Sequence, residues 1–205
     1  MSLELYLAFV LTSAMLALIP GPNVALIVAN SIAHGVRFGL LTVAGTSVAM
    51  AAQLGLTALG TQALMIALSG WFEMLRWAGV AYLIWLGIRA WRAPAADLAA
   101  TRPQARQTGR LLLKAFLVAL TNPKTLLFYG AFLPQFITPA TDPGPQLALL
   151  AVTFLAVAGT IDSLWAILAA RARVALARHG RLRNRLTGSL LIGSGTGLAL
   201  ARPSG

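Results

Sequence analysis

Long runs of apolar residues recur along the chain, and short polar or basic stretches separate them. The runs lack the alternation of a membrane β-strand, and a bilayer requires each one to satisfy its backbone hydrogen bonds internally, as a helix does. The pattern therefore predicts an all-α, polytopic membrane protein. Six transmembrane helices are expected, at about residues 3–33, 39–60, 70–91, 111–133, 147–170 and 186–202.

The composition agrees with lipid as the solvent of this chain. Hydrophobic residues make up 58% of its 205 residues, more than a soluble domain of this size can bury. A net charge of +11 is typical of proteins that bind nucleic acid, but Lys and Arg are confined here to the connections between apolar runs. Positive-inside sorting explains this distribution, so no nucleic-acid partner is expected.

Metal and cofactor sites are not expected either. Cysteine is absent, and His34 and His179 fall in connections, without a metal-ligand or Ser/His/Asp cluster. The lysines do not lie in a phosphate-binding loop, so direct ATP hydrolysis is not expected. A membrane enzyme is therefore the weakest of the functional alternatives.

Basic residues predict the orientation in a bacterial inner (plasma) membrane. Arg37 follows the first predicted helix. Basic residues also surround the connection from the third to the fourth helix, at Arg89, Arg92, Arg102, Arg106, Arg110 and Lys114, and fill the connection from the fifth to the sixth, at Arg171, Arg173, Arg178, Arg181, Arg183 and Arg185. The remaining connections and the N-terminus contain no Lys or Arg. Both termini are therefore predicted outside, and the basic connections are expected to contact anionic lipid.

The chain divides into two halves within a single membrane domain. Residues 1–91 form a first three-helix repeat, 92–110 a cytoplasmic linker rich in Ala, Pro, Arg and Gln, and 111–205 a second repeat. Three helices per half give the repeats opposite orientations. Each half opens with an interrupted helix, at Pro20-Gly21-Pro22-Asn23 and at Thr121-Asn122-Pro123-Lys124. Inverted repeats with paired breaks near the midplane are typical of secondary transporters.

The two breaks offer the chemistry that an amino acid requires. Proline has no N–H, so the breaks leave unpaired carbonyl oxygens at Leu16, Leu18 and Ala119 that can accept from an ammonium group. Asn122 and Pro123 fit the cap and first residue of a new helix, whose amides favour a carboxylate. The predicted substrate-binding residues are Pro20, Gly21, Pro22, Asn23, Asn122, Pro123 and Lys124. The alternative is that the prolines are ordinary packing kinks.

Lys124 and Asp162 are the charged residues placed deepest within the predicted helices. Charges at this depth are costly and face an interior or a cavity. We expect Asp162 to couple transport to protons and Lys124 to contribute to carboxylate binding. A static ion pair that fastens the fourth helix to the fifth is the alternative.

Three further residues are candidates for helix packing. Gln53 lies deep in the second helix, and a polar amide there is expected to join two helices or to form a secondary polar site. Gly193 and Gly197 form a GxxxG pattern in the last helix. That pattern serves contacts within one subunit or a homo-oligomer.

In combination and order, these motifs resemble the lysine exporter and homoserine/threonine resistance family, LysE/RhtB, over almost the whole chain. The matching segments are the two breaks, Gly79-Val80-Ala81-Tyr82-Leu83 with Gly87, Phe128, Leu133-Pro134-Gln135-Phe136, and Gly188, Gly193, Gly197 and Leu198. The resemblance implies proton-driven export of amino acids or derivatives. Family members often have an acidic or imidazole side chain in the second helix, where this chain has Met50 and Gln53. That departure transfers the expected proton coupling to Asp162.

The predicted function is therefore a secondary transporter that exports an amino acid or derivative by proton antiport. Its partners would be the small-molecule substrate, protons and membrane lipid. A non-transporting assembly protein is the alternative, since kinks and GxxxG patterns also serve assembly.

Overall fold

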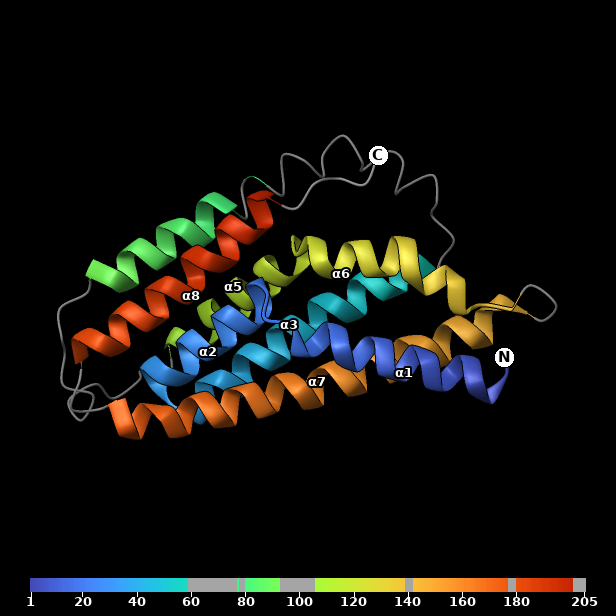
Figure 1. Cartoon of the computed structure of the whole chain (residues 1–205), viewed down its shortest axis with the longest axis horizontal. Helices are drawn as coiled ribbons and strands as arrows, with labels where there is room; N and C mark the ends of the chain where they lie inside the picture. Colours follow the sequence, from blue (N-terminus) through green and yellow to red (C-terminus); the bar gives the residue numbers. More distant parts are fainter. Residues whose placement is uncertain (59–76, 78–79, 93–105, 139–141, 177–179, 201–205) are drawn as a thin grey trace.

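A computed structural model describes residues 1–58, 77, 80–92, 106–138, 142–176 and 180–200, and this part of the chain contains helices and no strand (Figure 1). The all-α prediction is confirmed for these residues. The predicted helix at 70–91 is described only at residues 77 and 80–92, which are helical, and most of the predicted linker lies outside the described residues.

The first predicted break is confirmed. Helix α1 covers Leu3–Leu18 and α2 covers Pro22–His34, and the two are bent by 53°. Gly21 is the N-cap of α2, and Pro22 is its first residue. Pro20 and Pro22 cannot donate to the preceding turn, so the helical hydrogen bonding ends and restarts here.

The second predicted break is also confirmed. Helix α5 covers Arg106–Leu120 and α6 covers Pro123–Leu127, with a bend of 51° between Thr108–Leu120 and Lys124–Gly130. The Asn122 side chain accepts a hydrogen bond from the Lys124 amide at 3.1 Å, which confirms the predicted N-cap. A π-helical turn, η1 (Phe128–Phe132), and a 3-10 turn, η2 (Leu133–Phe136), follow.

Two long helices are unbroken: α3 at Val36–Ala58 and α7 at Pro143–Leu176. Helix α7 has 34 residues, about 51 Å of helix, and runs along most of the molecule's length (Figure 1). The last helix, α8, covers Gly180–Leu200. Segments Val36–Thr57 and Pro143–Arg173 are long and apolar enough to cross a membrane, and each bent pair can count as one further span. The described residues thus contain two to four candidate spans, as a polytopic membrane protein requires.

Several helices extend beyond the predicted boundaries. Arg171 and Arg173 lie in α7 and Arg181 and Arg185 in α8, so the prediction that they belong to a connection is corrected. Helix α5 begins at Arg106, inside the predicted linker. Hydropathy marks only the apolar part of a helix, whereas arginine is a good helix former and continues the hydrogen bonding past it.

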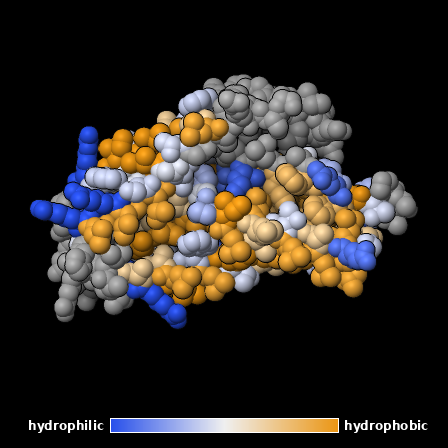
Figure 2. Space-filling view, in the orientation of Figure 1, coloured by the Kyte–Doolittle hydropathy of each residue, from blue (hydrophilic) through white to orange (hydrophobic). Residues whose placement is uncertain are grey.

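Helix α2 lies at the centre of the packing. It contacts α3, α7 and α8, while α3 also packs against α5 and α7. The helix over residues 80–92 lies beside α8 (Figure 1), where Gly87 and Gly188 permit a close approach: a methyl group at Gly188 would be 2.7 Å from the Gly87 carbonyl oxygen. Figure 2 shows apolar side chains over much of one face, with hydrophilic ones mostly toward its ends.

Candidate functional site

A small cavity lies where the two helix breaks meet. Its volume is about 20 Å³, room for about one water molecule. It is lined by residues of α1, α2, α3, α6 and α7, namely Leu16, Ala17, Asn23, Val24, Met50, Lys124, Thr125, Phe154, Ala158 and Asp162. An amino acid is larger than this space, so the helices around the cavity must move apart to admit one.

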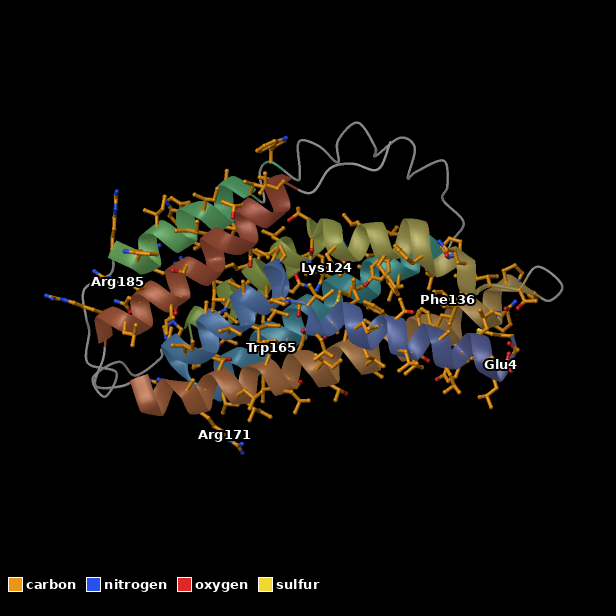
Figure 3. All side chains as sticks on the ribbon, in the orientation of Figure 1. Glu4, Lys124, Phe136, Trp165, Arg171 and Arg185 are labelled. Atoms are coloured by element: carbon orange, nitrogen blue, oxygen red, sulfur yellow. The ribbon has the colours of Figure 1, made fainter. Side chains whose placement is uncertain are left out.

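Lys124 joins the second break to the first. Its ammonium group donates to the carbonyl oxygens of Leu16 at 2.9 Å and Ile19 at 2.7 Å. Figure 3 labels Lys124 near the middle of the molecule. The missing amide of proline was predicted to leave the Leu16 carbonyl oxygen without a hydrogen bond. In the structure, that oxygen accepts a hydrogen bond from Lys124. The side chain passes Gly21, where a methyl group would be 3.4 Å from the Lys124 Cε. In this conformation Lys124 therefore binds two backbone carbonyl oxygens, and the predicted binding of a substrate carboxylate would be a further role.

Gln53 joins α3 to the second break. Its amide group donates to the oxygens of Ala119 at 3.2 Å and Leu120 at 2.9 Å, and its own oxygen accepts from the Thr125 hydroxyl at 3.4 Å. The Ala119 oxygen is another that proline was predicted to free, and it accepts from the Asn122 amide at 3.1 Å as well. Each break is therefore capped by a side chain from the other half of the sequence.

Asp162 lies on α7 and is 4% exposed. It lines the cavity together with Lys124, but no ion pair within 4 Å joins the two side chains. The static ion pair considered as an alternative is therefore absent from this conformation. The Asp162 carboxyl group is thus positioned to contact a small polar molecule in the cavity.

The first turn of α2 offers donors to the same cavity. Asn23 is buried, its amide nitrogen lies 4.0 Å from the Met50 sulfur, and its side-chain oxygen has no hydrogen-bond partner among the described residues. The N-cap Gly21 provides no side chain to cap the helix amides. The positive end of the α2 dipole is thus available to an anionic group.

Several cavity residues were missed by sequence reasoning. Phe154, Ala158 and Asp162 lie four residues apart on α7, a spacing that indicates one helix face and could have found the first two. Thr125 follows Lys124 in the first turn of α6. Met50 was noted in the sequence only as a departure from the family pattern in the second helix, not as a cavity residue.

The GxxxG glycines lie apart from this cavity. A methyl group at Gly193 would meet no described atom within 4 Å, and Gly197 lies in the same helix. The close helix contact uses Gly188, five residues earlier, with Gly87. Within the described part of the chain, Gly193 therefore makes no close helix contact.

Comparison with known proteins gives a consistent result. The profile of the LysE type translocator family matches residues 14–202. A homoserine/homoserine lactone efflux protein of Salmonella typhimurium is 37% identical over 204 residues, covering 98% of this chain and 99% of that protein. An uncharacterized membrane protein of Vibrio cholerae is 34% identical over 98% of this chain and 100% of its own length. A leucine efflux protein of Enterobacter sp. is 33% identical over 71% of this chain and 70% of its own. No solved structure matches.

Proposed function

This chain belongs to the family of LysE type translocators, and from that premise we propose that it exports amino acids or close derivatives across the bacterial inner membrane. Translocators move solutes rather than convert them, so the chain is not an enzyme. The observation that carries the proposal is the cavity between the two helix breaks, with Lys124 and Asp162 in its wall. An assembly protein would not require two such costly charges at one cavity.

The relatives' names suggest the substrate chemistry. Homoserine, homoserine lactone and leucine all carry an α-ammonium group, whereas the lactone has no free carboxylate. The ammonium group is therefore the feature that such substrates share. In this chain, Asp162 and the carbonyl oxygens at the first break would receive it, and the α2 amides with Asn23 and Lys124 would receive a carboxylate where one is present.

Transport would proceed by alternating access between two inverted repeats, residues 1–91 and 111–205, joined by the linker at 92–110. Support comes from the reciprocal caps, in which Lys124 of the second repeat binds the first break and Gln53 of the first repeat binds the second. Breaking and remaking these contacts would let one repeat move against the other around a fixed site. In this arrangement the membrane contains six spans, with both termini outside.

Proton antiport would supply the driving force through Asp162. One proton crossing about 150 mV releases roughly 3.5 kcal/mol, enough for a substrate gradient of a few hundredfold. A buried carboxyl group on the cavity wall can exchange its proton for the substrate's ammonium group, as antiport requires. Lipid surrounds the exposed apolar faces, and a homo-oligomer remains compatible with the open Gly193 face.

Counterflow in proteoliposomes tests the proposed function. Purified full-length protein is reconstituted with unlabelled homoserine or leucine inside, and labelled substrate is added outside. We expect uptake that depends on the internal substrate and is absent from protein-free vesicles. Absence of counterflow across a panel of amino acids and amino-acid lactones would contradict export of this class.

A further inference from the structure

Lys124 donates hydrogen bonds to the same carbonyl oxygens that a substrate's ammonium group would use. We infer that Lys124 is a tethered competitor of the substrate: its ammonium group occupies the subsite formed by the Leu16 and Ile19 carbonyl oxygens until the ammonium group of a substrate displaces it. The inference rests on the proposed function and assigns the ammonium subsite within it. Its direct evidence is the pair of hydrogen bonds, 2.9 and 2.7 Å long, of which the one to Leu16 lies at the wall of the cavity and the one to Ile19 lies on the exposed side of the break.

The helix dipole is a second reason why a cation is favoured at these two carbonyl oxygens. They end α1, whose 16 residues direct the negative end of the helix dipole toward the break. Across the break, α2 begins with the uncapped amides and the buried Asn23. Adjacent negative and positive helix ends match the ammonium and carboxylate groups of one amino acid, so the same break orients the substrate.

The lysine side chain is able to leave. It has four flexible methylene groups, its hydrogen bonds go to neutral oxygens, and no ion pair with Asp162 holds it. Gly21 lies beside the lysine side chain and has no side chain that would block its movement. When a substrate's ammonium group takes the two oxygens and faces Asp162, the substrate's own carboxylate is the anionic group to which the Lys124 ammonium group can move at the cavity.

This exchange has a consequence for selectivity. An amino acid offers the displaced lysine a carboxylate, whereas a lactone or amide does not. Wild-type protein should therefore bind an amino acid more tightly than its carboxylate-free counterpart. Removal of the lysine ammonium group removes the competitor, and the carboxylate-free compound should gain most from that removal.

Competition binding to purified Lys124→Met tests the inference, with leucine, leucinamide, homoserine and homoserine lactone as the probes. We expect leucinamide and homoserine lactone to bind about tenfold more tightly than to wild type, since one charge-assisted hydrogen bond is worth at least that factor. The amino acids should gain less, or lose affinity, because their carboxylate loses a partner. Lys114→Met, which removes a lysine that contacts Tyr82 and does not line the cavity, should leave all four affinities unchanged.

Other outcomes overturn the inference. If Lys124→Met binds the amino acids more weakly and the amide and lactone as before, Lys124 is only a carboxylate ligand. If all four affinities fall together with the melting temperature, Lys124 is a structural tie. Lys124→Gln retains an uncharged donor for the two oxygens, so it gives the same comparison, with a smaller expected gain, should the Met variant fail to fold.

The inference and the proposed function fail in distinguishable ways. Counterflow by wild-type protein without the expected gain in Lys124→Met would refute the competitor role and leave export intact. A gain in amide and lactone binding by Lys124→Met, without counterflow by wild type, would support the subsite and refute export.

Discussion

At the scale of single residues, Asp162 is the described acidic side chain that lines the cavity. Asn keeps its size but cannot ionise, so Asp162→Asn should lose export against a gradient while retaining substrate exchange, which needs no net proton movement. Uphill export and counterflow, measured in the same vesicles, separate the two activities. Uphill export at the wild-type rate would exclude Asp162 as the coupling residue.

Gln53 makes a contribution that can be measured as stability. Gln53→Leu leaves the part-buried Leu120 oxygen without its side-chain donor, and loss of such a hydrogen bond costs about 1 kcal/mol. The melting temperature in detergent should fall accordingly. Thr160→Val is the matched control, since its exposed hydroxyl bonds only to Ala156 of its own helix and should be nearly neutral. Equal melting temperatures for both variants would show that Gln53 does not hold the break.

At the scale of elements, the breaks depend on the missing amide of proline. In Pro123→Ala the restored N–H can bond to the Ala119 oxygen in competition with Gln53 and the Asn122 amide, and a bond of about 1 kcal/mol shifts a conformational population roughly fivefold toward a straight helix. Pro22→Ala should act similarly at the first break. Both variants should insert normally but transport several times more slowly, as counterflow would measure.

Pro143→Ala is the control for these substitutions because Pro143 is exposed in the first turn of α7. It should retain wild-type transport. Full transport by both Pro22→Ala and Pro123→Ala would contradict a site built on broken helices.

Helix packing gives a second prediction at this scale. In Gly188→Ala the added methyl group would lie 2.7 Å from the Gly87 oxygen and 3.1 Å from Trp91, so α8 must move from the helix over residues 80–92. Such overpacking costs about 1–3 kcal/mol. Gly193→Ala meets no described atom and should be neutral or slightly stabilising. Thermal unfolding of the two variants would show the difference, and equal stability would contradict the close contact.

At the scale of the whole molecule, the basic residues predict that both termini lie outside. A tag at the N-terminus should react with an impermeant reagent in intact spheroplasts. A tag that reacts only after permeabilisation would reverse the predicted orientation. A tag in the linker at 92–110 should show the opposite behaviour and serves as the internal control.

The sequence by itself determined the helices, the two breaks and the family. Apolar runs and missing proline amides are local properties of the chain, so they could be interpreted without knowledge of its path in space. The predicted helix ends were less accurate, because arginines can continue a helix beyond its apolar part, as Arg171 and Arg173 do in α7.

Only the tertiary structure decided which groups meet at the breaks. Lys124 lies 108 residues from Leu16, and Gln53 lies 66 residues from Ala119. Proline predicted that the oxygens at Leu16 and Ala119 would be free. In the structure each accepts from a side chain of the other half of the chain, and Ala119 accepts from the nearby Asn122 amide as well. A hydrogen bond depends on atoms within about 3 Å of each other, and spacing along the sequence does not determine that distance between distant segments.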